Sequence, residues 1–249
     1  MLALLASSPK PLKVLPMCPD RSVTHEPGCT LASGGLVLEW IMPTALITGA
    51  GRGLGKEFAR QYEAHGWRVI AATRRELDVT DRAQIASFAA RIKDPIDLLL
   101  CNAGIAGKRG TALGSFDYDS WEEVLRVNLL GAAAVVEAFV ENVAASDRGV
   151  VAFMSSRLGS IAEASGHTLP YATSKAALNA LAKGLSVALA DRGIIVVALS
   201  PGWVRTDMGG KGAPLSPAES VRGLRKVIEG LEPGDSGRFL NHDGTPIPW

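Results

Sequence analysis

Residues 44–55, TALITGAGRGLG, decide the fold. A short apolar run, 45–48, leads straight into a loop with glycines at 49, 51, 53 and 55, and a helical pattern follows over 54–65. Glycine permits the positive φ of a tight turn and a close approach of backbone to ligand. The free N–H groups at a helix start attract an anion. This order predicts a site for the pyrophosphate of a dinucleotide.

Two alternatives compete with that interpretation of the loop. A glycine-rich turn without any ligand is disfavoured because this one lies between a strand and a helix. A Walker phosphate loop is disfavoured because no Gly-Lys-Ser/Thr follows the glycines.

The chain beyond the loop alternates between short apolar runs and helical patterns. Further strands are expected at 68–73, 96–100, 150–154 and 194–199, and helices at 54–65, 80–93, 118–145 and 170–191. The strand runs are apolar throughout, as in strands buried on both faces of a parallel sheet. The fold class predicted is α/β, a Rossmann-type doubly wound parallel sheet flanked by helices.

The first part of the chain differs from the rest. Residues 1–42 contain five prolines and no sustained hydrophobic period, so they are expected to form a disordered N-terminal extension. A start codon upstream of the natural one would explain this stretch, and a cleaved signal peptide is the less favoured explanation because the domain that follows has the features of a cytosolic protein. Residues 43–249 are expected to form a single Rossmann domain.

Charge and cysteine content narrow the range of partners. The net charge is +1, which gives no electrostatic reason to expect nucleic acid or a membrane surface. No apolar stretch is long enough to span a bilayer. The three cysteines and four histidines lack the spacing of a disulfide framework or a metal site, so no metal is expected and a cytoplasmic location is the simplest inference.

Basic residues at the end of the second strand bear on cofactor choice. Folds that prefer NAD usually place an acid there to bind the ribose 2′-hydroxyl. Here the strand ends in Thr73-Arg74-Arg75, and Arg52 lies in the glycine loop. Guanidinium groups favour the 2′-phosphate of NADP, so NADP(H) is predicted over NAD(H). The alternative is that these arginines are solvated surface charges.

Tyr171 and Lys175 lie four residues apart at the start of a helix, so their side chains share one face. A phenol is a poor acid or base at neutral pH, but a neighbouring ammonium group stabilises the phenolate. The pair could therefore move a proton beside a hydride transfer. The spacing alone is a weak signal, since such pairs also occur in surface packing.

Seven motifs occur in an order that resembles the short-chain dehydrogenase/reductase family. They are TGAGRGLG (48–55), LDVTD (77–81), CNAG (101–104), VNLLG (127–131), MSSRLGSI (154–161), YATSK (171–175) and PGWVRTDM (201–208). The run MSSRLGSI, the segment SKAALNAL and the ending Pro248-Trp249 are most similar to the subgroup of C-factor-like and sniffer-like carbonyl reductases.

The resemblance implies roles for individual residues. Asn128 would hold a water in a proton relay to Lys175, Ser156 would bond the substrate carbonyl, and Tyr171 would be the general acid in reduction and the base in oxidation. Lys175 would also bind the nicotinamide ribose. The cofactor-binding set implied is Gly49, Arg52, Gly53, Leu54, Gly55, Arg74, Asp78, Val79, Asn102, Ala103, Gly104, Tyr171, Lys175, Pro201, Gly202, Val204 and Thr206.

The chain departs from the family pattern in several places. Arg75 and Leu77 are nearly adjacent, so the helix and strand that usually follow the second strand are expected to be shortened or missing, leaving the adenine end of the pocket more open.

Ser155 competes with Ser156 for the catalytic role, and Ser156 is preferred because it stands three before Gly159. Cys101 replaces a usual asparagine and is interpreted as a buried thiol. Loop 157–169 is longer than usual, and the candidate pocket liners are Leu158, His167, Trp203 and Met208.

Together these features predict an NADP(H)-dependent oxidoreductase that interconverts a small ketone or aldehyde and an alcohol. The alternative is a dinucleotide-binding signalling or regulatory protein of the C-factor type with little catalytic activity. The resemblance allows a homodimer or homotetramer, although the small residues of the helices at 118–145 and 170–191 suit packing on the sheet equally.

Overall fold

The glycine loop follows the first strand of a parallel sheet. The computed structural model describes residues 42–108, 113–166 and 168–249. Within them the sheet has six strands in the order β2-β1-β3-β4-β5-β6, and every pairing is parallel. The strands are β1 (Thr44–Thr48), β2 (Arg68–Ala72), β3 (Leu98–Cys101), β4 (Val150–Met154), β5 (Ile195–Ser200) and β6 (Phe239–Asn241). The order reverses between β1 and β3, which confirms the doubly wound Rossmann-type prediction.

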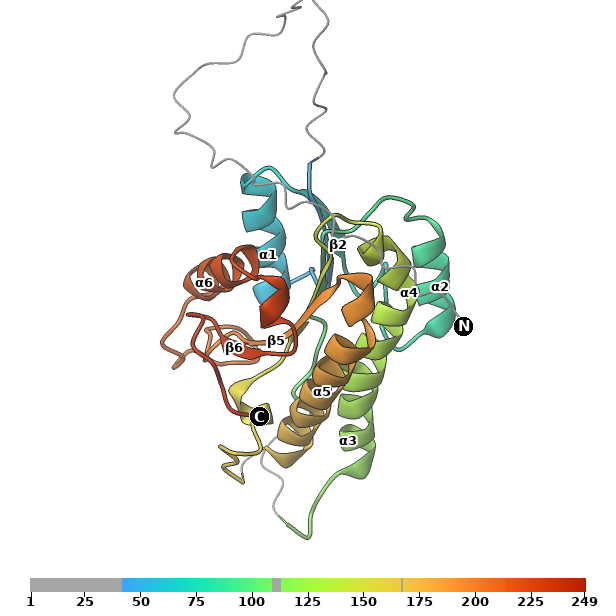
Figure 1. The fold of residues 1–249 in the computed structure, drawn as a ribbon. Coiled ribbons are helices and arrows are strands. Elements are labelled where there is room, and N and C mark those ends of the chain that lie inside the picture. The colour runs from blue at the N-terminus through green and yellow to red at the C-terminus, as the bar shows by residue number, and fades with distance from the viewer. Residues whose placement is uncertain (1–41, 109–112, 167) are drawn as a thin grey trace, which may run out of the picture. The chain divides into compact units, whose positions relative to one another are not determined.

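Helices cover both faces of this sheet. They are α1 (Gly53–Ala64), α2 (Arg82–Ala90), α3 (Tyr118–Leu125), α4 (Ala132–Ala144), α5 (Leu169–Ala188) and α6 (Pro217–Glu229). In Figure 1, α1 and α6 lie on one side of the strands and α2, α4 and α5 on the other. Each side buries its own hydrophobic core, one around Phe58 and Leu224 and the other around Phe139 and Leu178. Successive residues of the central strands point alternately into these two cores, which explains why β3 and β4 are apolar at every position.

The helix expected over 118–145 is interrupted. Residues Arg126–Gly131 form a π-helical segment, η1, between α3 and α4. This π-helical segment contains Asn128, whose side chain is buried at 1% exposure. Gly131 packs on Val79, because a Cβ there would lie 2.8 Å from the Val79 Cγ2 atom. Such π-bulges often occur at functional sites.

Two elements near the C-terminus were not predicted from the sequence. One is β6, which has three residues and pairs with β5. The other is α6, which begins with a capping box: Ser216 accepts a hydrogen bond from the backbone of Glu219, and the Glu219 side chain bonds back to Ser216. This signature, with Pro217 at the first turn, was readable in the sequence.

The segment after β2 is short, as expected. The chain turns at Thr73, where the backbone N–H groups of Glu76 and Leu77 both donate to the Thr73 carbonyl, and Asp81 then caps α2. Among the described residues β2 pairs with β1 alone, so it forms one edge of the sheet.

The expected extension, residues 1–42, lies outside the described residues except for Met42, and the boundary at 42/43 stays a prediction.

Candidate active site

A cavity of about 710 Å³ opens at the carboxyl ends of β1, β3, β4 and β5. This is where open parallel sheets bind their ligands. The predicted site residues that line it are Gly49, Arg52, Gly53, Leu54, Gly55, Arg74, Asp78, Val79, Asn102, Ala103, Gly104, Tyr171, Lys175, Pro201 and Thr206. Segments separated by more than 150 residues along the chain thus meet at one edge of the sheet.

Four predicted residues do not line this cavity. Asn128 is buried within η1, and Ser156 is half-buried beside the lining residue Ser155. Gly202 has a φ of 74°, and Val204 is buried and pairs with Leu215 in an isolated bridge.

The glycine loop can pack its backbone closely against itself and the end of β3 because Gly49 and Gly55 have no side chains. Gly49 has a φ of 67°, and a Cβ there would lie 2.9 Å from the Cα of Ala103. At Gly55 a Cβ would overlap the carbonyl oxygen of Gly49 and lie 2.6 Å from the Asn102 amide nitrogen. Asn102 supports the loop from β3, since its Nδ2 donates to the Thr48 carbonyl at 2.9 Å. The cradle therefore needs glycine at both positions.

The arginines at the adenine end are exposed and paired with acids. Arg74 lies 3.2 Å from Asp78, and the Arg52 guanidinium lies 2.8 Å from the carboxylate of Asp207. Hydrogen bonds from the backbone and hydroxyl of Thr80, with a smaller contribution from Arg74, hold the pKa of Asp78 below its ordinary value. An exposed ion pair of this kind stabilises a protein by at most about 1 kcal/mol. An anionic ligand can therefore replace the acid and bind either arginine.

Tyr171 and Lys175 share the face of α5 that borders the cavity. The Lys175 amino group lies 5.6 Å from the centroid of the Tyr171 ring and donates to the Met154 carbonyl at 2.8 Å. Lys175 is 3% exposed, and burial lowers its pKa from 10.5 to about 8. A cation held this close to a phenol favours the phenolate.

Asn128 is fully bonded behind this pair. Its Oδ1 accepts from the backbone of Ile105 at 2.8 Å, and its Nδ2 donates to the Ile105 carbonyl at 2.9 Å and to the Ser174 hydroxyl at 3.0 Å. Ser174 in turn donates to the Tyr171 carbonyl at 2.7 Å. The side chain thus ties η1 to the loop after β3 and to the first turns of α5.

The two serines at the end of β4 differ in their bonding. The Ser155 hydroxyl is buried and donates to Oδ1 of Asn179 at 2.5 Å, which occupies it inside the fold. Ser156 is half-buried, and its hydroxyl oxygen accepts from the backbone of Leu158 at 3.2 Å, so the hydroxyl proton stays available. This difference supports the preference for Ser156, although Ser155 is the one that lines the cavity.

Several lining residues were missed from the sequence: Gly51, Leu77, Ile105, Ala106, Glu123, Val127, Met154, Ser155 and Asp207. Asp207 directly follows the predicted Thr206, and Val127 directly precedes the predicted Asn128, so adjacency along the chain could have found both. Of the candidate pocket liners, Met208 lines the cavity. Leu158 and Trp203 do not, at 40% and 60% exposure, and His167 lies outside the described residues.

Cys101 lies buried at the end of β3. Burial raises the pKa of its thiol to about 12, which keeps the thiol protonated. This environment supports a packing role.

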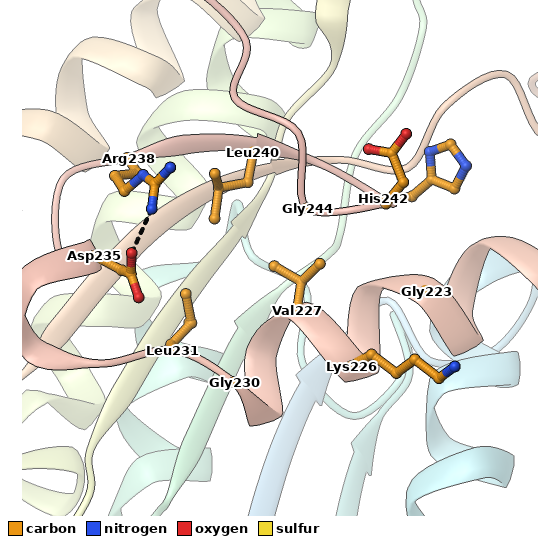
Figure 2. Close-up of a pocket in the computed structure, with 11 residues that line it drawn as sticks. Gly223, Lys226, Val227, Gly230, Leu231, Asp235, Arg238, Leu240, His242 and Gly244 are labelled. Atoms are coloured by element: carbon orange, nitrogen blue, oxygen red, sulfur yellow. Dashed lines mark hydrogen bonds and ion pairs between the residues drawn. The ribbon is translucent and has the colours of Figure 1, made fainter.

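A second, shallower cavity of about 380 Å³ lies between α6 and β6, away from all of these residues. Figure 2 shows its apolar floor, made by Val227, Leu231 and Leu240, and the ion pair of Arg238 with Asp235 at 2.5 Å. It holds none of the predicted catalytic side chains.

Two features are absent from the residues that the structure describes. None of their helices is long and apolar enough to cross a membrane. Nor do they contain a group of three or more His, Cys, Asp or Glu side chains that could hold a metal ion.

Comparison with known proteins agrees with the fold and the motifs. The family model described as short chain dehydrogenase matches residues 72–214, more than half of the chain. C-signal of Myxococcus xanthus is 42% identical over 165 residues, a match that covers 66% of this chain and 99% of that protein.

Solved structures of carbonyl reductases have the same fold as this chain. The carbonyl reductase Sniffer of D. melanogaster superposes with a TM-score of 0.75 at 29% identity, covering 84% of this chain and all of that one. An NADPH-bound carbonyl reductase from chicken fatty liver gives 0.75 at 28% identity, covering 84% and 99%.

The sheet order and the ligand cleft define a Rossmann-type oxidoreductase fold. The chain belongs to the short-chain dehydrogenase/reductase family, and its relatives include C-signal and the sniffer-type carbonyl reductases, as its motifs indicated.

Proposed function

We propose that this protein is an NADP(H)-dependent oxidoreductase that interconverts a ketone or aldehyde and an alcohol. One observation carries the proposal: Tyr171 and the buried Lys175 line the same cavity as the glycine loop. This arrangement supports a proton-transfer pair beside a dinucleotide cradle, which is what a hydride transfer to a carbonyl requires.

The residues present fit a nicotinamide dinucleotide, because the glycine loop, whose close packing needs Gly49 and Gly55, borders the same cavity as Lys175. The glycine loop would hold the pyrophosphate, and Asp78 and Val79 would line the adenine pocket. The ribose contacts would come from the segment 102–104 and from Lys175. Further contacts on the nicotinamide side would come from Pro201 and Thr206, and Gly202 and Val204, which do not line the cavity, would support them. When bound, the nicotinamide supplies or accepts the hydride.

The chain's own side chains would handle the proton. Tyr171 gives its hydroxyl proton to the carbonyl oxygen in reduction and takes it back in oxidation. Lys175 stabilises the phenolate left behind, and the Ser156 hydroxyl donates a hydrogen bond to the same substrate oxygen. Asn128 would take part in a proton relay to Lys175 through its backbone, because its amide is already bonded to Ile105 and Ser174.

The preference for NADP rests on Arg52 and Arg74, which both border the cavity. The acid near the end of β2, Glu76, is occupied elsewhere, since its carboxylate accepts from the backbone and hydroxyl of Thr73 at 3.0 and 2.8 Å. The NADPH-bound structure of a related carbonyl reductase supports the same choice.

The decisive experiment compares wild type with Tyr171→Phe, measuring NADPH oxidation with a panel of ketones and aldehydes. We expect wild-type turnover and a loss of at least 100-fold in kcat in the variant, with NADPH binding retained within about threefold. If both proteins are equally inactive while NADPH still binds, the enzyme proposal fails.

A second candidate is a dinucleotide-binding signalling or regulatory protein, which the 42% identity to C-signal favours. The same experiment separates the two. A binding protein would take up NADPH with unchanged affinity in both forms and oxidise it in neither.

Domain organisation, assembly and location belong to the same proposal. We infer a single domain over 43–249 preceded by an extension over 1–42, and a homodimer or homotetramer in the cytoplasm. Light scattering on the purified protein tests the assembly, and limited proteolysis, which should cut before residue 43, tests the domain boundary.

A further inference from the structure

Asn179 lies on the same stripe of α5 as Tyr171 and Lys175. The three residues are spaced four apart, so one side of the helix carries all of them (α5 in Figure 1). Asn179 lies one turn deeper than Lys175, is 3% exposed and does not line the cavity. A polar side chain buried at this depth needs partners, and their positions show what it holds.

The Asn179 amide bonds to both ends of the segment that carries Ser156. Its Oδ1 accepts from the Ser155 hydroxyl at 2.5 Å, and its Nδ2 donates to the Gly159 carbonyl at 3.1 Å. Ser155 directly precedes Ser156, and Gly159 ends the 3-10 turn Arg157–Gly159 that follows it. One side chain thus clamps the beginning and the end of a five-residue segment.

The same turn lies directly against the backbone of α5. A Cβ at Gly159 would lie 2.7 Å from the carbonyl carbon of Lys175. From the other side, β5 holds the segment, since the backbone of Ser155 donates to the Leu199 carbonyl at 2.7 Å and that of Arg157 to the Ser200 hydroxyl at 3.1 Å. The bonds from β5 fix the segment relative to the sheet, whereas Asn179 fixes it relative to the helix of Tyr171 and Lys175.

We propose that Asn179 is a positioning residue that sets the Ser156 hydroxyl against Tyr171 and Lys175. The inference rests on the proposed function, because it assigns Asn179 an effect through Ser156. Catalytic groups must be held within about 0.5 Å of their productive places, and a displacement of about 1 Å can cost about 100-fold in rate. A buried amide that bonds both flanks of Ser156 to α5 supplies that restraint.

The first test is a double-mutant cycle with Asn179→Leu and Ser156→Ala. Leucine matches the size of asparagine but removes both bonds. We expect Asn179→Leu to lower kcat by 10- to 100-fold while the Kd for NADPH, followed by its fluorescence, changes less than about threefold. In the Ser156→Ala background the same change should lower kcat by less than about threefold, because the group it positions is already gone. Effects that multiply would show that Asn179 acts independently of Ser156 and would overturn the proposal.

Two further variants distinguish the loss of Ser156 positioning from a general loss of folding stability. Ser155→Ala removes one of the two bonds and should cause a smaller loss of kcat than Asn179→Leu. Asn142→Leu is the matched control, because Asn142 also donates to two backbone carbonyls, those of Ile92 and Asp94, far from the cavity. It should lower stability without coupling to Ser156.

Hydrogen exchange gives a measurement that does not depend on activity. The backbone N–H groups of Gly159 and Ser160 bond to the carbonyls of Ser156 and Arg157 within the turn. In Asn179→Leu their exchange should accelerate by at least about tenfold, and in Asn142→Leu it should not. Unchanged exchange in Asn179→Leu would overturn the proposal even if the enzyme is active. Faster exchange in a wild-type protein that reduces no carbonyl would leave the clamp standing and reject the proposed function.

Discussion

At the scale of the residue, Lys175 has to keep an ammonium group in a fully buried place. The lowering of its pKa from 10.5 to about 8 corresponds to about 3 kcal/mol at about 1.36 kcal/mol per pKa unit. In the unfolded chain the amino group holds its proton up to about pH 10.5, whereas in the folded chain it loses the proton above about pH 8. Between these pH values the unfolded state binds more protons, so folding stability gains as pH rises.

Lys175→Met should reveal that dependence. Relative to the variant, wild type should gain up to about 3 kcal/mol in the free energy of unfolding as pH rises from 8 to 10.5, because methionine does not titrate. Urea unfolding of both proteins at pH 7.5, 8.5 and 9.5 measures the difference. If the free energies of unfolding of the two proteins change with pH in the same way, the burial of Lys175 does not lower its pKa.

Arg74 tests the choice of cofactor at the same scale. If its guanidinium binds the 2′-phosphate, Arg74→Ala should raise the Kd for NADPH by about 10- to 100-fold and leave that for NADH within about threefold. Arg75→Ala is the control, since Arg75 does not line the cavity. An unchanged ratio of the two affinities in Arg74→Ala would remove this arginine from the cofactor site.

At the scale of the element, the sequence predicted those segments whose local pattern is strong. The five longer strands were found because residues such as Leu46 and Ile47 are apolar on both faces. The π-helical segment was missed because it lies inside a continuous helical stretch, and Arg126–Gly131 contains no proline that would mark a break. β6 was missed because three residues such as Phe239-Leu240-Asn241 carry too little pattern of their own and depend on pairing with β5.

The contact between α1 and α6 offers a prediction at this scale. The Tyr62 hydroxyl is buried there without a hydrogen-bond partner among the described residues, beneath the guanidinium of Arg225 at 5.2 Å from the ring. Removing an unsatisfied buried hydroxyl removes its desolvation cost, so Tyr62→Phe should stabilise the protein by about 1 kcal/mol. Denaturant unfolding measures this against Tyr118→Phe, where the ring is 66% exposed and no change is expected. A loss of stability in Tyr62→Phe would show that the hydroxyl has a bonding partner after all.

At the scale of the whole molecule, the site forms where the carboxyl ends of the strands meet, and its membership was predictable only in part. Gly49, Tyr171 and Lys175 could be read from local motifs. The pairing of Arg52 with Asp207 could not, because it joins residues 155 positions apart and depends on how the loops after β1 and β5 approach each other. The bonds of Asn179 to Ser155 and Gly159 could not be predicted either, because they depend on how α5 packs against the segment after β4.

Cofactor binding should stabilise the whole folded chain by mass action. At a concentration 100 times its Kd, NADPH should add about 2.7 kcal/mol to the free energy of unfolding, seen as a rise in Tm. Gly55→Ala should abolish the rise, because its methyl group would overlap the Gly49 carbonyl. Gly184→Ala should keep it, since a Cβ at this helical glycine meets nothing within 4 Å. A normal thermal shift in Gly55→Ala would contradict the cradle.

The short connection after β2 also affects how molecules meet in solution. Among the described residues, the outer side of β2 has no neighbouring strand, and such an edge can pair with the same edge of another molecule. This edge is only five residues long, with Arg68 at its start and Arg74 just beyond its end. Each of these arginines is paired with an acid of its own chain, Arg68 with Asp94 and Arg74 with Asp78, so repulsion between like charges gives little protection. The shortness of the edge, rather than its charge, therefore limits pairing between two copies.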